Sequence, residues 1–269
     1  MIVESENDIK HLKAIGHICA MTLKKMMESA KPGMTTGELD DIGLKFLEKE
    51  GARSAPMAMY HFPGATCISV SPIIAHGIPG DRVMREGDLI NIDVSAEMNG
   101  YYGDTGASMV LAKHVPEYEK MLAAARSALE KAVSVARAGN PLNLIGKTIQ
   151  EEAKQHGYGV IFDLTGHGIG HKLHEEPTEV FNYFKPKDDR ILTEGLVLAI
   201  EPFLTTGKGH VHEERDGWSL RTIDRTIAAQ FEHTVIVTKD EPIILTKNPP
   251  FLSIFFNPKG DKESQRKKL

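Results

Sequence analysis

The spacing of apolar side chains along the chain predicts its helices. Over residues 6–29, apolar residues recur at helical intervals and leave a charged face opposite them. Thr36 is expected to cap a second helix that ends near Glu50. Similar spacing predicts two more helices, over 116–137 and about 142–156. Each pair of helices is followed by segments with the patterns typical of β-strands.

The two helix pairs resemble each other in sequence. Residues 30–51 align with residues 136–157 at a constant offset of 106 positions, with glycines at corresponding places. Two unrelated helices with similar caps would also give this match, but we favour an internal duplication. The chain would then consist of two α-then-β halves, over about 1–112 and 115–248, that face each other across a shared cleft.

A strongly patterned hairpin brings two aspartates together. Residues 89–94 are typical of an apolar strand, and an Asn-Gly turn at 99–100 would pair Ser95 with Asp104. Asp93 and Asp104 are then diagonal neighbours on one face, about 7–8 Å apart at Cα. Aspartates near turns often merely face solvent, but Asp93 lies within the apolar strand. A half-buried carboxylate there needs a partner, such as a metal cation or an arginine.

Two glutamates interrupt other apolar strands. Glu201 ends one such strand, and the alternation over 228–238 puts Glu232 on one face together with Gln230 and Thr234. For either glutamate alone, a structural salt bridge is the simpler explanation. Two embedded glutamates and two embedded aspartates in one chain are harder to explain in that way.

A cluster of histidines completes the candidate chemistry. The segment LTGHGIGHKLHEEPTEV, residues 164–180, contains His167, His171 and His174. Four carboxylates with one imidazole suit a two-metal hydrolytic centre, in which the ions lie about 3.5–4 Å apart. Such a donor set fits divalent Mn, Fe, Co or Zn. Phosphate binding at 166–170 is disfavoured, because the lysine and the spacing of a P-loop are missing.

Composition restricts the class of protein further. The 269 residues carry a formal net charge of −5, which gives no reason to expect nucleic-acid binding. Cys19 and Cys67 fit a reducing compartment better than a disulfide framework. No signal peptide or membrane span is expected, so the predicted location is cytoplasmic. Residues 249–269 are expected to form a partly flexible C-terminal extension; its basic end could touch ribosomal RNA, but a flexible end is favoured.

Five stretches, in this order, resemble the motifs of type I methionine aminopeptidases, which belong to peptidase family M24. They are AHGIP (75–79), GDLINIDV with GYYGDTG, TGHGIGHKLHEEP, LAIEPF and DGWSLRTIDRTIAAQFEHTVIVT. The resemblance covers about residues 5–246. It implies an α+β pita-bread fold with pseudo-twofold αβ halves and a central antiparallel curved sheet covered by helices. A single catalytic domain would occupy residues 1–248.

The resemblance also implies a role for each site residue. Five residues would bind two divalent metal ions, namely Asp93, Asp104, His167, Glu201 and Glu232. Asp104 and Glu232 would reach both ions. The residues that act in catalysis would be His174, His76 and Glu201. The substrate would contact His76, His174, Tyr60, Phe62, Cys67, Leu173 and Trp218, of which the last five would surround the methionine side chain.

The same resemblance implies a mechanism. A hydroxide that bridges the two ions would attack the first peptide bond. His174 would hydrogen-bond the scissile carbonyl and the tetrahedral intermediate, and His76 would contact the substrate amide or its developing anion. Glu201 would move the proton from the bridging water to the leaving amine. His171 would take no part, because a surface or structural histidine is the default.

The implied activity is removal of the N-terminal methionine from nascent proteins and peptides, with a preference for a small second residue. The enzyme would be a cytoplasmic monomer with no membrane or specific nucleic-acid partner, and a transient contact with the ribosome is conceivable. One alternative is an Xaa-Pro aminopeptidase or prolidase, which shares the ligand pattern but usually has an additional N-terminal domain. A metal-free peptide-binding module is another, although such proteins typically lose ligands. Two positions depart from many relatives, namely Ser71-Pro72 before AHGIP and Leu173, where some relatives have an aromatic residue.

Overall fold

The first helix pair forms as the apolar spacing predicts. The structure, a computed structural model, describes residues 1–247, so the predicted extension over 249–269 lies outside them. Helices α1 (Glu6–Ser29) and α2 (Thr36–Lys49) pack against each other. The predicted cap of α2 is wrong by one residue: Thr35 is the N-cap, because its side chain accepts a hydrogen bond from the N–H of Glu38 while the Glu38 carboxylate binds the N–H of Thr35.

The second helix pair repeats this arrangement. Helices α4 (Pro116–Val135) and α5 (Asn143–Gln155) also pack against each other. The glycines at corresponding places in the two pairs share a left-handed backbone: Gly33 and Gly139 have φ of 88° and 90°, and Gly51 and Gly157 have φ of 78° and 80°. Residues with a side chain rarely adopt these angles. The two helix pairs therefore use glycine at the same two points, in the loop between the helices and just after the second helix.

The strands form antiparallel sheets, and the described residues contain four of them. The strands of the first half are β1 (Arg53–Ser54), β2 (Cys67–Val70), β3 (Ile73–Ala75), β4 (Leu89–Met98) and β5 (Tyr101–Val110), and a short helix α3 (Ala55–Tyr60) follows β1. Those of the second half are β6 (Gly159–Val160), β7 (Thr165–Gly168), β8 (Glu175–Phe181), β9 (Val197–Ile200), β10 (Phe203–Thr205), β11 (Val211–Glu213), β12 (Leu220–Thr222), β13 (Ala228–Gln230), β14 (His233–Ile236) and β15 (Ile243–Ile244).

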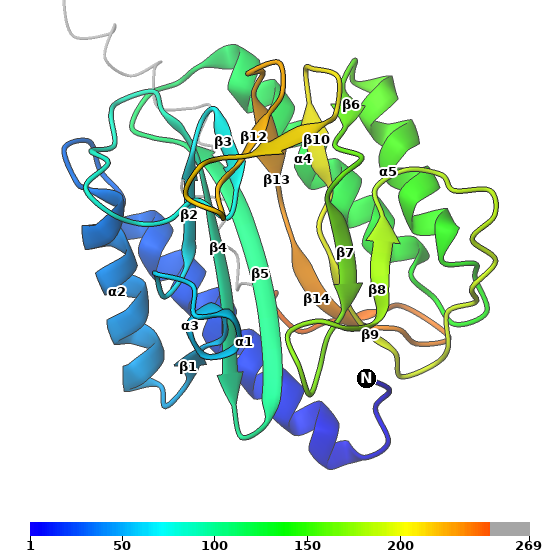
Figure 1. Cartoon of the computed structure of the whole chain (residues 1–269). Coiled ribbons are helices and arrows are strands. Elements are labelled where there is room, and N and C mark those ends of the chain that lie inside the picture. Colours follow the sequence, from blue (N-terminus) through cyan, green and yellow to red (C-terminus); the bar gives the residue numbers. More distant parts are fainter. Residues whose placement is uncertain (248–269) are drawn as a thin grey trace, which may run out of the picture.

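Two of the sheets dominate the centre of the molecule. One has the order β1-β4-β2 with β5 beside β4, and the other has the order β15-β14-β9-β7-β8. Ala107 of the first sheet forms an isolated antiparallel bridge with Phe231, just before β14 of the second. In Figure 1 the two sheets lie next to each other across this junction. The expected central antiparallel sheet is therefore made of two sheets joined by a bridge.

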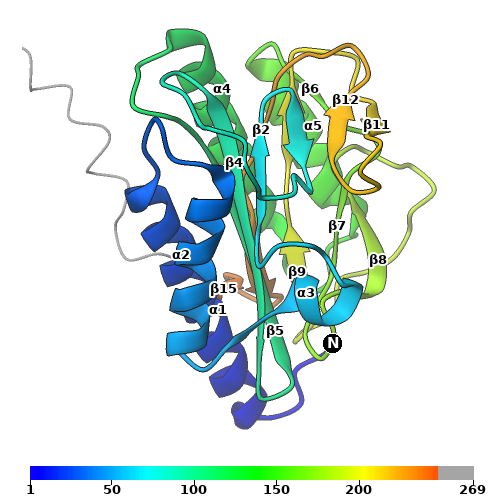
Figure 2. The same ribbon diagram turned by 60° about the vertical axis from the view of Figure 1, so that its left-hand side comes forward.

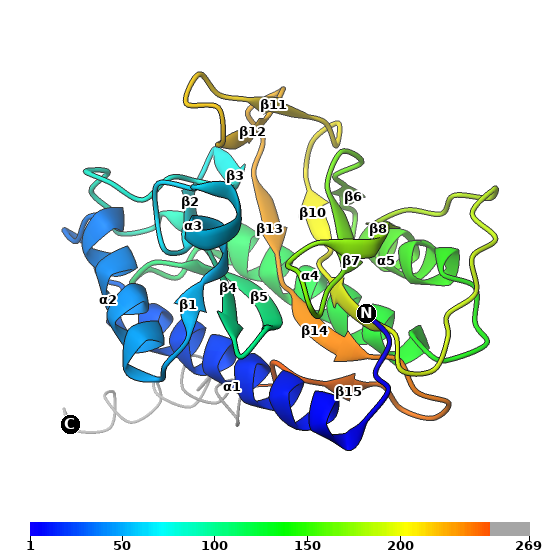
Figure 3. The same cartoon turned by 60° about the horizontal axis from the view of Figure 1, so that its bottom comes forward.

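Helices cover one face of these central sheets. Figure 3 shows α1 and α4 lying against β4, β5, β13 and β14, and their apolar residues share one buried cluster with those strands. The first helix also packs on the last described residues, because a Cβ added at Gly16 would lie 2.7 Å from the carbonyl oxygen of Leu245. Within residues 1–247, no helix combines the length and the apolar character needed to cross a membrane.

Candidate metal centre

The hairpin of β4 and β5 positions the two aspartates as its turn signal predicts. Ser95 is opposite Asp104 and Asp93 is opposite Gly106, so both aspartates project from one face of the hairpin. The Ser95 hydroxyl donates a hydrogen bond to Oδ1 of Asp104 over 2.7 Å. The hydroxyl of Thr234 accepts from the Asp104 N–H at 2.9 Å and donates to its carbonyl at 2.7 Å, which anchors β5 to the second sheet.

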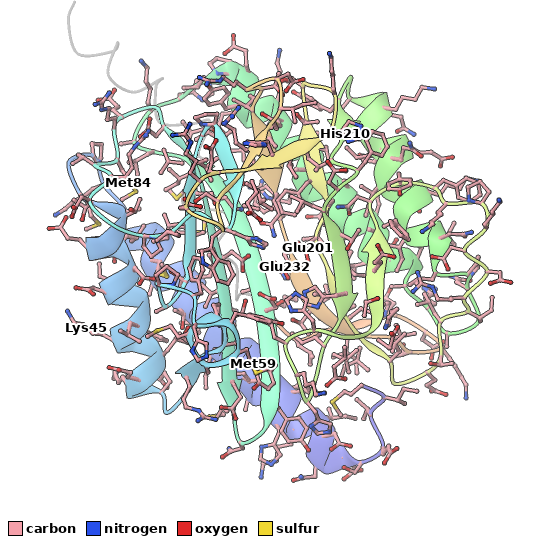
Figure 4. All side chains as sticks on the ribbon, in the orientation of Figure 1. Lys45, Met59, Met84, Glu201, His210 and Glu232 are labelled. Atoms are coloured by element: carbon pink, nitrogen blue, oxygen red, sulfur yellow. The ribbon has the colours of Figure 1, made fainter. Side chains whose placement is uncertain are left out.

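The second sheet brings the other three candidate ligands to the same place. His167 lies in β7 opposite Ala199 of β9, and Glu201 directly follows β9. The alternating segment over 228–238 is not one continuous strand, since it breaks between β13 and β14 where Glu232 donates its N–H to the carbonyl of Gly106. Figure 4 shows the Glu201 and Glu232 side chains close to each other at the centre of the molecule.

The buried imidazole of His167 faces two carboxylates with an unprotonated nitrogen. Its Nδ1 is 3.0 Å from the carbonyl oxygen of Gly168, which can only accept, so Nδ1 carries the proton. Nε2 lies 3.7 Å from Oδ2 of Asp104 and 3.6 Å from Oε1 of Glu201. Burial lowers the pKa of His167 to about 3, so the ring is neutral at physiological pH. A lone pair therefore points at two anionic oxygens, an arrangement that a cation between them would stabilise.

The four carboxylates lie close together, and their pKa values are raised. Burial raises the pKa of Asp93 to about 6, and burial with mutual repulsion raises the pKa of Asp104, Glu201 and Glu232 well above the usual range. Within residues 1–247, no lysine or arginine forms an ion pair with any of them. Buried anions that are neither paired nor protonated are unstable. Metal cations bound among the four carboxylates would balance their negative charge.

Two buried oxygens have no hydrogen-bond partner among the described residues, namely Oδ1 of Asp93 and Oε1 of Glu232. Ligand atoms of Asp104, His167 and Glu232 all lie within 4.8 Å of one another. Carboxylate oxygens with one imidazole nitrogen are a suitable donor set for divalent transition metals. The residues present thus fit a divalent metal site, and the free oxygens are available as ligands.

The histidines that are expected to act beside the metals lie at the solvent-exposed edge of this cluster. The ring of His174 is 4.1 Å from the ring of His167, centroid to centroid. Partial burial lowers the pKa of His174, and the nearby His76 lowers it further. His76 has a left-handed backbone with φ of 51°, an uncommon conformation for a residue with a side chain, and such strain is frequent at functional sites.

The predicted substrate residues come from several segments of the chain, and Cys67 is the one that pairs with an acidic residue across a sheet. Trp218 contacts Phe62 edge to face, with ring centroids 5.2 Å apart. Cys67 is buried on β2 directly opposite Asp93 of β4, so the two side chains lie close together on one face of the sheet. Leu173 is also buried and packs in a cluster with Ile169 and Val197.

Tyr60 has a contact that the sequence analysis did not anticipate. It ends α3, which contacts β1 and β4 and lies on the near side of the molecule in Figure 2. Its hydroxyl is 2.6 Å from Nδ1 of His174. An aromatic residue near a turn gave no signal of such a bond, because the bond joins segments more than a hundred residues apart.

Glu175 contacts the backbone of the histidine loop and none of the other four carboxylates. Its Oε1 accepts hydrogen bonds from the N–H groups of His171 and Lys172, at 2.7 and 2.6 Å. The exposed His171 ring instead lies on Tyr101, and its Nδ1 is 3.2 Å from the carbonyl of Gly100. The exposed His171 ring therefore contacts the tip of the β4–β5 hairpin, and Glu175 holds the backbone of residues 171 and 172.

Comparisons with known proteins agree with this geometry. Residues 10–239 match the model of metallopeptidase family M24. A methionine aminopeptidase of Staphylococcus epidermidis is 50% identical over 92% of this chain and 99% of that protein. The crystal structure of methionine aminopeptidase from Rickettsia prowazekii is 35% identical, with a TM-score of 0.87 over 92% of this chain and 100% of that one.

The prolidase of Pyrococcus furiosus is a more distant structure. It is 24% identical with a TM-score of 0.75, and the match covers 92% of this chain but only 66% of the prolidase. The pita-bread fold that the sequence motifs implied is confirmed by the solved methionine aminopeptidases. On its sequence and its fold, the chain belongs to metallopeptidase family M24.

Proposed function

We propose that this protein is a methionine aminopeptidase, a metal-dependent hydrolase that removes the N-terminal methionine from peptides and nascent proteins with a small second residue. The observation that carries the proposal is the buried cluster of carboxylates around His167, in which an imidazole lone pair and free carboxylate oxygens converge. A peptide-binding module would have no use for so many buried and unpaired acidic groups, because their desolvation is costly.

The proposed cofactors are two divalent ions, drawn from Co, Mn, Fe and Zn. Five residues would hold them, namely Asp93, Asp104, His167, Glu201 and Glu232. When bound, the ions would polarise the scissile carbonyl and lower the pKa of a water molecule. The hydrogen bond from His167 Nδ1 to Gly168 keeps Nε2 free as a ligand atom.

The remaining steps belong to side chains of the protein. Nε2 of the neutral His174 donates a hydrogen bond to the carbonyl oxygen of the first peptide bond, on which negative charge develops. His76 contacts the amide of that bond or its developing anion. Glu201 accepts a proton from the attacking water and passes it to the leaving nitrogen, so that the C–N bond breaks with release of a neutral amine.

The methionine side chain would occupy a pocket formed by Phe62, Trp218, Cys67, Leu173 and Tyr60. The edge-to-face pair of Phe62 and Trp218 presents aromatic edges, against which a thioether sulfur packs favourably.

We also propose that residues 1–248 form one catalytic domain with two duplicated halves. The protein would be a cytoplasmic monomer that acts on nascent chains. The matching glycine turns of the two halves support the duplication. The two free cysteines fit the reducing conditions of the cytoplasm.

Replacing Tyr60 with phenylalanine is expected to lower kcat for methionine release while KM stays the same. The substitution keeps the ring in the methionine pocket but removes the hydroxyl that holds Nδ1 of His174. One such hydrogen bond contributes about 1 kcal/mol, so kcat should fall about fivefold. Steady-state kinetics with a Met-Ala-Ser peptide measures both constants. Tyr102→Phe is the matched control, because within residues 1–247 the hydrogen-bond partner of its hydroxyl is Sδ of Met59. A rise in KM alone would show that the Tyr60 hydroxyl acts on binding instead.

A side-by-side peptide assay tests the proposed function. The protein is stripped of metal, reloaded with Mn or Co, and given Met-Ala-Ser and an Ala-Pro-led peptide. Release of methionine from the first peptide alone is the expected result. Cleavage of the Xaa-Pro bond instead would assign the protein to the prolidase side of the family. If neither peptide is cleaved and no metal is retained, a peptide-binding module would be the better explanation.

A further inference from the structure

Glu232 is held by a neighbouring buried amide. Nε2 of Gln230 donates a hydrogen bond to Oε2 of Glu232 over 3.0 Å. Both side chains are almost fully buried, with 1% and 2% of their surface exposed, so no solvent competes for this bond. The other oxygen, Oε1, has no partner among the described residues. One oxygen of this carboxylate is thus fixed by the protein and the other is left free.

A second buried amide fixes the orientation of the first. Nδ2 of Asn91 donates to Oε1 of Gln230 over 2.7 Å. A carboxylate can only accept hydrogen bonds, so the nitrogen of Gln230 must face Glu232 and its oxygen must face away. Asn91 supplies the donor that this outward oxygen needs. The same Nδ2 of Asn91 also donates to the hydroxyl of Ser108, at 3.2 Å.

The neighbouring strand leaves space for this amide. Gly106 of β5 faces Gln230, and a Cβ built there would lie 2.5 Å from Oε1 and 2.7 Å from Nε2 of the amide. Any larger residue at 106 would push the amide away. The side chains of Asn91 on β4 and Gln230 on β13 therefore meet over a glycine of β5, in the junction between the two central sheets.

We propose that Gln230 is a positioning residue, which holds Oε2 of Glu232 and thereby presents Oε1 to a divalent metal ion, and that Asn91 sets the orientation of the Gln230 amide. The proposal rests on the proposed function, because it assumes that Glu232 is a metal ligand. Neighbours that orient a metal-ligating side chain typically change metal affinity about 10- to 100-fold when they are lost. Neither amide touches the substrate or carries a charge, so their effect acts on the geometry of Glu232.

Calorimetric titration of the metal-free protein with Mn²⁺ tests this inference. Gln230→Met removes the donor at similar size, and an increase in the dissociation constant of about 10- to 100-fold is expected. At saturating Mn²⁺, kcat for methionine release should recover towards that of the unmodified protein. Gly106→Ala is a second, independent variant, because it displaces the same amide from the opposite strand; it should weaken Mn²⁺ binding in the same way.

Thr205→Val is the matched control for general damage to this region. The hydroxyl of Thr205 is fully buried and donates to the carbonyl of Ile227, in the strand pair of β10 and β13. Its loss should lower the melting temperature and leave the Mn²⁺ dissociation constant unchanged. If a folded Gln230 or Gly106 variant binds Mn²⁺ as tightly as the unmodified protein does, the role of Gln230 is wrong. That result would leave the proposed function standing. Absence of Mn²⁺ binding to the unmodified protein would overturn the proposed function as well.

Discussion

Replacing His174 with alanine is expected to lower kcat for methionine release by about 100- to 1,000-fold, with little change in KM. The neutral ring donates to the carbonyl oxygen only as charge develops there, so its loss removes stabilisation specific to the transition state. The Tyr60 hydroxyl lies at Nδ1 and orients the ring. When this hydroxyl donates to Nδ1, the proton of the neutral ring is on Nε2, which is then the free donor. Steady-state kinetics with Met-Ala-Ser at saturating Mn²⁺ measures the effect.

The same loop provides the control for this substitution. His171→Ala removes a ring from the same segment, yet that ring lies on Tyr101 and faces away from the four carboxylates. It should retain nearly full kcat. A comparable loss of activity in both variants would indicate that the whole loop was disturbed, and full activity in His174→Ala would assign the electrophilic role to another group.

Removing the metal ions is expected to abolish methionine release and to lower the melting temperature of the protein. A ligand that binds only the folded state stabilises it by about 2.7 kcal/mol at a hundred times its dissociation constant. The effect should be large here, because the ions would also relieve the repulsion among four buried carboxylates. Differential scanning calorimetry of the stripped and the Mn²⁺-loaded protein measures it, and equal melting temperatures would contradict the proposal.

The difference between the two melting temperatures should grow as the pH rises from about 5 to 7.5. In the metal-free protein the pKa of Asp93 is raised to about 6, above the value of about 3.9 in an unfolded chain. Its contribution to stability is therefore fully present below pH 4 and is lost as the pH rises through 6. Metal binding requires the deprotonated carboxylates, so Mn²⁺ affinity increases over the same range.

Asp104→Asn, which removes one of the repelling charges, should stabilise the metal-free protein near neutral pH.

The hairpin that carries Asp93 and Asp104 could be predicted in register because its information is local. The Asn-Gly turn fixes which residues pair, and the pairing fixes which side chains share a face. The start of α2 could also have been predicted from local information. Thr35 has Glu38 three residues on, which is the spacing of a capping box, whereas Thr36 has Leu39 at that place, so the expectation of Thr36 as the cap overlooked this signal.

Contacts between distant segments could not be predicted in this way. The alternation over 228–238 correctly puts Gln230 and Glu232 on one face. This shared face was the sequence's one indication that the Gln230 amide contacts the Glu232 carboxylate. Nothing local to Asn91 indicates that it meets Gln230 from another sheet. The strand also breaks at Glu232, because its N–H turns to the carbonyl of Gly106 rather than continuing the ladder. Tertiary packing overrides the strand pattern at the point where the site is formed.

The bridge between Ala107 and Phe231 has a consequence for biosynthesis. The two aspartates are joined to Glu232 only through contacts that span more than a hundred residues, and contacts of such high sequence separation form late and slowly in folding. The first helix also packs on Leu245, so it lacks its final neighbour until that residue has left the ribosome. A partial translation product that stops before Glu232 therefore lacks part of the proposed metal centre.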